Sequence, residues 1–470
     1  MNPLHSILAN LWSTLMVVVF FGGSIFVHEL GHFVAARRRG LRVERFSIGF
    51  GPAIWSHRGR DGVEYRLAWI PFGGYVLLPQ LADLAPIEGK SDVAAADLPA
   101  VGYASKMIVF AGGAAFNLLF AFCLACVISV IGQPASNMFE TTRIGYVQPV
   151  LRLQDGSSVP SPASVAGLKA GDTVQAVDGH AVTDWNILKE LLATSAGRDA
   201  RGRPRATFTI LRDGRAMDVT VLPVLEREDQ YRQVGIAPAC PAVVYQVEPG
   251  SPAAKAGILA GDEIIRADGS PVLSFAAIDA CQSKGRRTPI ALVIRRAGIE
   301  TAVAIPAAIA GNPDADLGIY YSPGLHMVYP SPFAQISEQV TMTFRTLWSL
   351  LNPHSDIGLS KMAGPIGIVH IFNIAVENGL REVFGFTILV NVNLAIFNLL
   401  PIPVLDGGQI LFATIGRLRR RALPANFVAA TQSLFMVLLF SMIIYVSYFN
   451  VRHWVSDARA ERAALPAAKP

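Results

Sequence analysis

The chain has 470 residues, of which 52% are hydrophobic and only 16% are charged, and its mean hydropathy is +0.40. A soluble domain usually carries about a quarter charged residues, so this composition argues against an ordinary soluble enzyme. The formal net charge is +5, and many of the basic residues form short runs. We interpret these runs as a membrane-topology signal, and we expect no nucleic-acid partner.

Four stretches of the chain approach the roughly 20 apolar residues that a helix needs to cross a bilayer. We expect transmembrane helices at 11–36, 107–132, 384–416 and 427–449. The first helix belongs to an N-terminal region that comprises residues 1–36. Pro401 and Pro403 interrupt the third. The block between the second and third stretches is far more polar, which predicts soluble domains inserted into a polytopic membrane protein.

The basic runs predict which ends of these spans face the cytoplasm. Short Arg-rich loops stay on the cytoplasmic side, and such runs follow the first and third spans, at 37–46 and 417–421. The first span lacks a basic preceding region and is too long for a cleavable signal peptide. The expected topology has 37–106 and 417–426 inside, and the N-terminus, 133–383 and a C-terminal tail, 450–470, outside.

The first span contains an unusual polar motif. Its only ionisable residues are His28, Glu29 and His32, in the pattern His-Glu-x-x-His. Histidines at i and i+4 lie on one face of a helix, so both imidazoles can reach one metal ion. Glu29 lies beside that face, where it can act as general base, and a catalytic zinc then needs a third protein ligand.

Asp406 is the candidate for the third ligand. It is the only ionisable residue of the third span, and the second and fourth spans contain no Asp, Glu, His, Lys or Arg. Ionisable groups inside a membrane are costly and are functional candidates for that reason. The first and third spans run in the same direction and carry these groups late, so we expect all four at a similar depth, toward the cytoplasm.

The external block contains an internal repeat. Residues 161–179 and 251–269 are identical at ten of nineteen positions, and each is followed by two alternating strands around a turn. A period near 90 residues is the size of a domain, not of a solenoid repeat. We expect two domains, at 133–229 and 230–325. The unit resembles the PDZ domain of bacterial envelope proteases.

The chain as a whole resembles the site-2 protease family of intramembrane zinc metalloproteases, in the branch of regulator-of-sigma-E proteases with tandem PDZ domains. The motifs that carry the resemblance are HELGH (28–32), FAGGAAFNLLFA (110–121) and NLLPIPVLDGG (398–408). The resemblance implies that Zn²⁺ is the cofactor, that His28, His32 and Asp406 are its ligands, and that Glu29 is the catalytic base.

The resemblance also implies a membrane-associated β-hairpin at 46–78, whose edge pairs with the substrate. The alternative is a cytoplasmic hairpin with no catalytic role. Between the repeat and the third span, within 326–383, the pattern predicts interfacial helices at 333–351 and 362–376. The expected substrate contacts are Asn393, Asn398, Asn117, Gly73 and Gly74.

The predicted fold is a polytopic α-helical membrane protein with four transmembrane helices, a membrane-associated β-hairpin and two inserted α+β PDZ domains. The expected location is the bacterial inner membrane, with the PDZ domains in the periplasm. The expected function is zinc-dependent cleavage of single-span membrane proteins, such as a pre-trimmed anti-sigma factor or remnant signal peptides, in regulated intramembrane proteolysis.

Two functions from other classes stay open. One is a catalytically inactive scaffold that binds envelope proteins through its PDZ pair, and the other is an ion or proton transporter that uses the histidines and Asp406 as a relay. Whether the PDZ domains bind peptides or only exclude bulky substrates is also open, as is a disulfide between Cys240 and Cys281.

Overall fold

The computed structural model divides the chain into two units. One comprises Met1–Gln133, Tyr329–Phe344 and Ser360–Pro470, and the other comprises Pro134–Val328 and Arg345–Leu359. Parts of the expected cytoplasmic loop, at 82–97, and of the C-terminal tail, at 465–470, lie outside the described residues. The structure describes 3–81, 98–153, 157–225, 232–281, 287–306, 316–356 and 362–464, together with 309 and 358.

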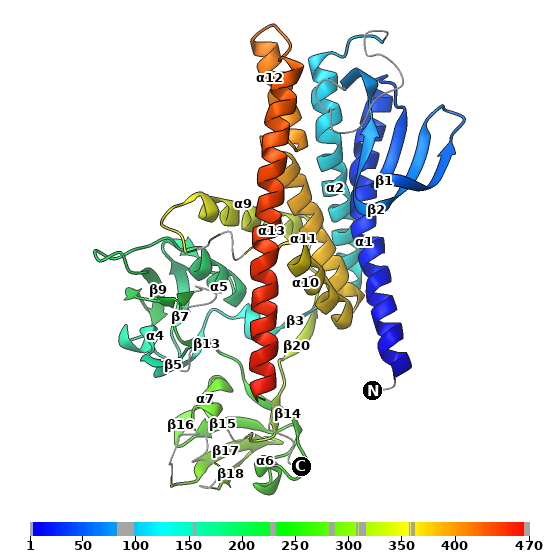
Figure 1. Ribbon diagram of the computed structural model, residues 1–470. Helices are drawn as coiled ribbons and strands as arrows, with labels where there is room; N and C mark the ends of the chain where they lie inside the picture. Colours follow the sequence, from blue (N-terminus) through cyan, green and yellow to red (C-terminus); the bar gives the residue numbers. More distant parts are fainter. Residues whose placement is uncertain are drawn as a thin grey trace. The chain divides into compact units, whose positions relative to one another are not determined.

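Four helices among the described residues of the first unit are long and apolar enough to cross a membrane (Figure 1). Many of their large apolar side chains are exposed, and a bilayer would cover them. The four candidate spans are Leu11–Arg38 in α1 (Pro3–Arg38), Tyr103–Ile131, which is α2, Leu380–Asn398, which is α11, and Ala425–Arg452 in α13 (Ala425–Ala464).

The third span is shorter than the sequence predicted. In place of one interrupted span over 384–416, α11 ends at Asn398 and a separate helix, α12 (Asp406–Leu418), begins at Asp406. The break contains both prolines, which lack the N–H that a helix needs and disfavour helical geometry in the preceding residue. Asp406 is therefore held at the first position of a new helix.

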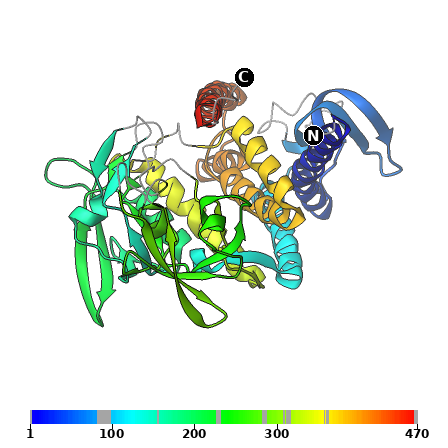
Figure 2. The ribbon, with the colours of Figure 1, turned by 90° about the horizontal axis from the view of Figure 1, so that it is seen from below.

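The helices of the first unit pack closely. α1 packs on α2, α2 packs on α11, and α10 (Pro365–Asn378) contacts α1, α11 and α13 (Figure 2). At the α1–α2 crossing, a Cβ at Gly31 would overlap the Gly112 carbonyl group, so these glycines permit the backbones to approach. The first part of α9 (Pro332–Leu351) packs on α2, where the Gln335 side chain donates to the Ala125 carbonyl oxygen.

β1 (Arg45–Arg58) and β2 (Glu64–Leu77) form the hairpin, which lies against α1 (Figure 1). It is more folded than the simple hairpin expected at 46–78. Residues 45–48 pair both with 64–67 and with 74–77, while 53–58 pair with 64–68. Gly49 has a φ of +87° at the bend, and a Cβ there would lie 2.8 Å from the Ile70 carbonyl oxygen.

The second unit holds two small α+β domains with separate hydrophobic cores. In the first, the sheet has the order β10-β9-β7-β8, and the amphipathic helix α5 buries Trp185 and Leu188 in the same core as Phe208. Its elements are β7 (Thr173–Val177), β8 (His180–Ala181), α5 (Trp185–Thr194), β9 (Ala206–Arg212) and β10 (Arg215–Val221), with the pair β4 (Ile144–Val147) and β13 (Ile236–Pro238).

The second domain has the strand order β18-β17-β15-β14-β19, with β16 paired to β15. Its elements are β14 (Ala242–Val247), α6 (Pro252–Lys255), β15 (Glu263–Ala267), β16 (Ser270–Pro271), α7 (Ala276–Asp279), β17 (Ile290–Arg296), β18 (Ile299–Ile305) and β19 (Ile319–Tyr321). The remaining short elements are η1 (Pro79–Leu81), β3 (Gln133–Ser136), α3 (Asn137–Glu140), β5 (Val150–Arg152), β6 (Ser158–Pro160), α4 (Pro162–Val165), β11 (Val224–Leu225), β12 (Arg232–Gln233) and β20 (Leu325–Val328).

The boundary placed between 229 and 230 is wrong. β13 pairs with β4 of the first domain, and Val234 is buried in the first core. The strand that closes the first domain thus lies within the range predicted for the second. A local match of the repeated motif could not reveal this pairing, because the partner strand lies about 90 residues earlier.

Each of the two domains has an arginine–aspartate pair at the same position of the repeated motif. Arg212 donates two hydrogen bonds to Asp172, at 2.6 and 2.7 Å, and Arg296 donates two to Asp262, both at 2.7 Å. Both aspartates are buried. The disulfide left open by the sequence is not formed: the Cys240 and Cys281 thiols make separate hydrogen bonds, to the carbonyl oxygens of Pro241 and Ala277.

Candidate metal centre

Three side chains converge where the start of α12 meets α1. Nε2 of His28 and Nε2 of His32 are 3.1 Å apart, because the two residues are one helical turn apart on α1. Asp406 Oδ2 lies 3.3 Å from the first of these nitrogens and 3.4 Å from the second. The structure thus brings together the three residues that the sequence predicted as metal ligands.

The donor triangle fits a tetrahedral zinc ion. Bonds of about 2.0–2.1 Å from zinc to nitrogen and oxygen imply donor–donor separations of about 3.3–3.4 Å at tetrahedral angles. The three observed separations are 3.1, 3.3 and 3.4 Å. Asp406 Oδ2 is buried and has no hydrogen-bond partner among the described residues, which is unfavourable for a carboxylate oxygen unless a cation is present.

The imidazole rings are held from α2. His32 Nδ1–H donates to the Val109 carbonyl oxygen, 2.8 Å away, and this bond leaves the Nε2 lone pair directed at the cluster. Asn117 lies 3.2 Å from the His28 Nδ1 through its side-chain amide. The two ring planes are nearly perpendicular, at 81°, with centroids 4.7 Å apart.

Gly113 provides the space for both rings. A Cβ at this position would lie 2.5 Å from His28 Cε1 and 2.5 Å from His32 Nε2. Since carbon atoms in van der Waals contact are about 3.5–4.0 Å apart, no larger residue fits here unless the imidazoles move. The sequence marked Gly113 only as a departure from the family's Ala-Gly-Pro pattern, with a consequence for the bend of this helix, and did not predict its contact with the imidazoles.

Glu29 is buried, with 8% of its surface exposed, between α1 and the hairpin. A Cβ at Gly74 would lie 2.7 Å from Glu29 Cγ, so the strand residue lies directly against this side chain. Gly73, the preceding residue, faces the Phe50 ring and has a φ of +114°. The hairpin therefore reaches the candidate base, although it contributes no ligand atom to the triangle.

The predicted asparagines occupy different surroundings. Asn117 has no exposed surface and contacts His28, so the structure offers it no access to a substrate. The Asn393 amide oxygen is 2.6 Å from the Thr343 hydroxyl of α9, and Asn398 is the last residue of α11. Among the contacts of the described residues, neither Asn393 nor Asn398 touches the His28–His32–Asp406 triangle.

A buried polar bond between α1 and α11 was not predicted from the sequence. Asn391 has no exposed surface, and its amide donates to the Ser24 hydroxyl at 2.9 Å. Ser24 is one helical turn before His28, so this bond fixes how α11 sits against the metal-ligand face of α1. Asn391 belongs to the same apolar span as the two predicted asparagines. A polar side chain in such a span is costly, and this could have marked Asn391 as a candidate for a bond between helices.

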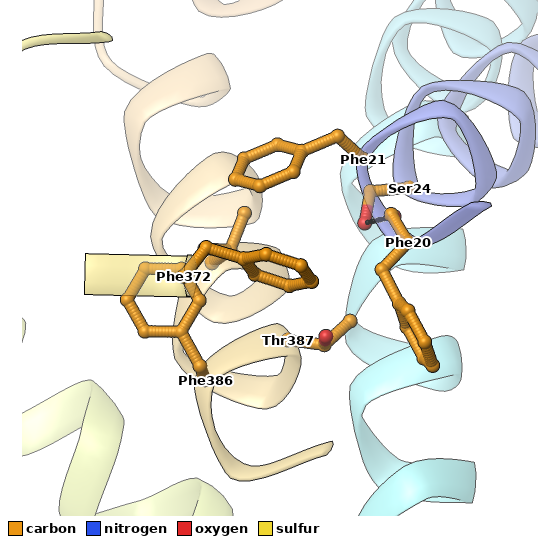
Figure 3. A pocket seen from close by; sticks show the side chains of 7 residues that line it. Phe20, Phe21, Ser24, Phe372, Phe386 and Thr387 are labelled. Carbon is orange, nitrogen blue, oxygen red and sulfur yellow. Dashed lines mark hydrogen bonds between the residues drawn. The ribbon is translucent and has the colours of Figure 1, made fainter. Parts of the chain in front are cut away.

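Aromatic side chains pack between α1, α10 and α11, next to the bond between Ser24 and Asn391. Side chains of α1, α10 and α11 enclose a crevice too narrow to admit a water molecule, beside Ser24 and Thr387 (Figure 3). The Phe21 and Phe372 rings meet edge to face, with centroids 5.3 Å apart. Such contacts add to the burial of apolar surface and keep this side of α1 dry.

The fold and the site define a class of protein: a membrane protein in which three side chains that could hold a metal ion converge beside apolar helices. The sequence model of peptidase family M50 matches residues 16–442. The chain belongs to peptidase family M50. It is a zinc metallopeptidase of the site-2 protease type, which confirms the enzyme class and the cofactor predicted from the sequence.

Curated relatives match this chain along nearly all of its length. The regulator of sigma-E protease RseP of Escherichia coli (strain K12) is 31% identical over 466 residues, which cover 93% of this chain and 98% of that protein. The regulator of sigma E protease of Salmonella typhi is 29% identical over 471 residues, with the same coverage. A putative zinc metalloprotease of Vibrio cholerae serotype O1 is 27% identical over 481 residues, which cover 94% and 98%.

Proposed function

We propose that this chain is an endopeptidase that cleaves single-span membrane proteins inside the bilayer, with His28, His32 and Asp406 as zinc ligands and Glu29 as general base. The observation that supports this most strongly is the donor triangle, because its dimensions match tetrahedral zinc and both of its histidines lie in a candidate membrane span. An inactive scaffold would not need to retain such a set.

Each of these side chains has a distinct task. A bound zinc supplies Lewis-acid chemistry, polarising the scissile carbonyl and acidifying water. Glu29 accepts the proton of the attacking water and passes it to the leaving nitrogen, which a buried carboxylate beside the ligands can do. Protonation of that nitrogen allows the peptide bond to break.

The hairpin offers a place for the substrate backbone. A transmembrane helix hides its amides in its own hydrogen bonds, so it must unwind before it is cut, and the freed groups then need partners. Residues 74–77 pair with 45–48 on one side and, within the described part of the chain, with no strand on the other. An extended substrate segment added there would pass Gly74 and Glu29.

The two α+β domains are, in this proposal, PDZ domains in the periplasm of a bacterium whose inner membrane holds the helices. They capture peptide ends or exclude proteins with bulky external domains. Because relatives carry the name regulator of sigma-E protease, the proposed substrate is an anti-sigma factor that has already been trimmed outside, together with remnant signal peptides.

The decisive experiment uses the purified full chain in detergent with a model single-span substrate. We expect Glu29→Gln to keep its zinc and to lower the cleavage rate by about 10²–10⁴-fold, the usual contribution of a general base. Glu382→Gln, at an exposed carboxylate in the first turn of α11, is the matched control and should cleave normally. Full activity of Glu29→Gln would remove Glu29 from the mechanism.

Metal analysis tests the ligand assignment separately. Asp406→Ala and His28→Ala should each purify with much less zinc than the unmodified chain. If both variants kept a full complement of zinc, the site would lie elsewhere. The transporter alternative predicts ion movement in liposomes and no loss of function on chelation, so chelator-sensitive cleavage without transport contradicts it.

A further inference from the structure

We infer that Asn117 is a positioning residue that holds His28 in the tautomer able to bind a metal, by presenting its amide oxygen to the His28 Nδ1–H. This inference rests on the proposed role of His28 as a zinc ligand. It replaces the expectation that Asn117 contacts the substrate.

The two nitrogens of the His28 ring face different neighbours. Nε2 faces the cluster, 3.1 Å from His32 Nε2 and 3.3 Å from Asp406 Oδ2. Nδ1 faces α2, where the nearest polar group is the Asn117 amide, 3.2 Å away through Nδ2. Asn117 has no exposed surface, so this contact is shielded from solvent.

The chemistry of the ring decides which amide atom belongs at that contact. A neutral imidazole carries one N–H, and a ring nitrogen that binds a metal must offer its lone pair. Nδ1 of His28 must then carry the proton and donate it. An amide nitrogen has no lone pair available to accept a hydrogen bond, whereas the amide oxygen accepts readily.

The two orientations of the Asn117 amide differ only by exchange of oxygen and nitrogen, and hydrogen-bond partners choose between them. With Nδ2 toward the ring, the His28 proton would sit on Nε2 and point into the cluster, where it would block a metal. In that orientation Asn117 Oδ1 is buried without a hydrogen-bond partner in the described structure, and exchanging the two atoms moves this deficit to Nδ2, so the requirement of the ring and not the amide decides between them. With Oδ1 toward the ring, the oxygen gains the Nδ1–H and Nε2 is free to bind.

The proposed ligand His32 is held in the same way, by an oxygen acceptor on α2. Val109, Gly113 and Asn117 are four residues apart in turn, so they form one stripe along α2. The first supplies the carbonyl oxygen that accepts His32 Nδ1–H at 2.8 Å, and the second supplies the space for both rings. Asn117 completes this stripe as the acceptor for the other ring. Oxygen acceptors behind metal-binding histidines are the general pattern of such sites.

The test measures zinc affinity of the full-length protein in detergent by competition with a chelator, and so requires no cleavage assay. Asn117→Asp keeps the oxygen acceptor and removes the amide nitrogen, whereas Asn117→Leu removes both and keeps the branched shape of the side chain. We expect Asn117→Asp to bind zinc within about threefold of the unmodified chain, and Asn117→Leu to bind about 10–100-fold more weakly.

The matched control is Asn450→Leu, which removes another asparagine that bonds between helices, where α13 meets the start of α10: Asn450 accepts from the Gly364 N–H and donates to the Met362 carbonyl oxygen. It should lower the unfolding temperature of the metal-free protein as much as Asn117→Leu does, yet leave zinc affinity within about threefold of the unmodified chain. An equal loss of affinity in both leucine variants would show that the effect is one of packing and would overturn the inference.

Two further outcomes would also overturn it. If Asn117→Asp lost as much zinc affinity as Asn117→Leu, the amide nitrogen would be the contacting atom. If Asn117→Leu bound zinc normally, the contact would not matter for the ligand. His28→Ala separates this result from the underlying proposal. Normal zinc binding by His28→Ala would overturn the metal site itself. If His28→Ala lost zinc binding while Asn117→Leu bound zinc normally, only the role of Asn117 would be overturned.

Discussion

Gly74 of β2 lies directly against Glu29 of α1, so closely that a Cβ at Gly74 would come 2.7 Å from Glu29 Cγ and 3.2 Å from Glu29 Cδ. The φ angle of Gly74 is not in the left-handed region, so its backbone conformation does not require glycine. The contact with Glu29 and with the Ser47 carbonyl oxygen explains why no side chain fits.

Gly74→Ala should therefore displace the carboxylate and lower kcat by at least about tenfold, because small misplacements of a catalytic group are costly. Zinc content should stay unchanged, since no ligand atom touches this residue in the described structure. Tyr75→Phe, which removes only a hydroxyl from the next residue, is the control. An unchanged kcat in Gly74→Ala would mean that the strand adjusts without moving Glu29.

Gly113→Ala should weaken zinc binding by more than about tenfold, since the added methyl group would occupy space that both imidazoles need. Gly23→Ala on α1 is the matched control, because a Cβ there meets nothing within 4 Å. It should bind zinc normally and be as stable or more stable, given the roughly 1 kcal/mol that alanine gains over glycine in a helix. Equal zinc affinity in both variants would contradict the packing argument.

A buried ion pair stabilises the first α+β domain. The Arg232 side chain has no exposed surface, and it donates to Asp356 at 2.7 Å, to the Ser195 hydroxyl at 2.7 Å and to two backbone oxygens. Asp356→Ala would leave this guanidinium buried without its counter-charge, so we expect the free energy of unfolding of this unit to fall by about 3–5 kcal/mol.

The measurement is hydrogen exchange of the full chain, read at the amides of β7 and β9. Arg203→Gln provides the comparison within the same domain, because it removes the exposed partner of Asp199 and should cost less than about 1 kcal/mol. If Asp356→Ala protected these amides as well as the unmodified chain does, the ion pair would not contribute to stability.

The second α+β domain should show a pH dependence that comes from Asp262. The Arg296 guanidinium hydrogen-bonds to the Asp262 carboxylate and holds its pKa below the usual value of 3.8. Because the folded pKa is lowered, this pair contributes stability above the unfolded pKa, and the contribution is lost as the pH falls through the folded pKa.

Arg296→Met should remove that contribution. The difference in amide protection of β15 and β17 between the unmodified chain and Arg296→Met should be large at about pH 6 and should shrink toward about pH 2. A difference that stayed constant over this range would show that Arg296 acts through packing alone and not through the charge of Asp262.

Much of the candidate site could be predicted from the sequence alone. Ionisable residues are so costly in apolar spans that the few present in this chain singled out His28, Glu29, His32 and Asp406. The i, i+4 spacing of the histidines required only the period of a helix. The repeat likewise indicated two domains, because identical local motifs build similar local structures.

The remaining features depend on which distant segments meet. The role of Asn117, the clearance at Gly113 and the contact between Gly74 and Glu29 involve residues on different elements, and nothing in the spacing of any one element encodes them. The same holds for β13, which closes the first domain by pairing with β4 across about 90 residues of chain. Local periodicity reports which face a residue occupies, but helix crossings and strand pairing decide what that face touches, because they are selected by the packing of the whole chain.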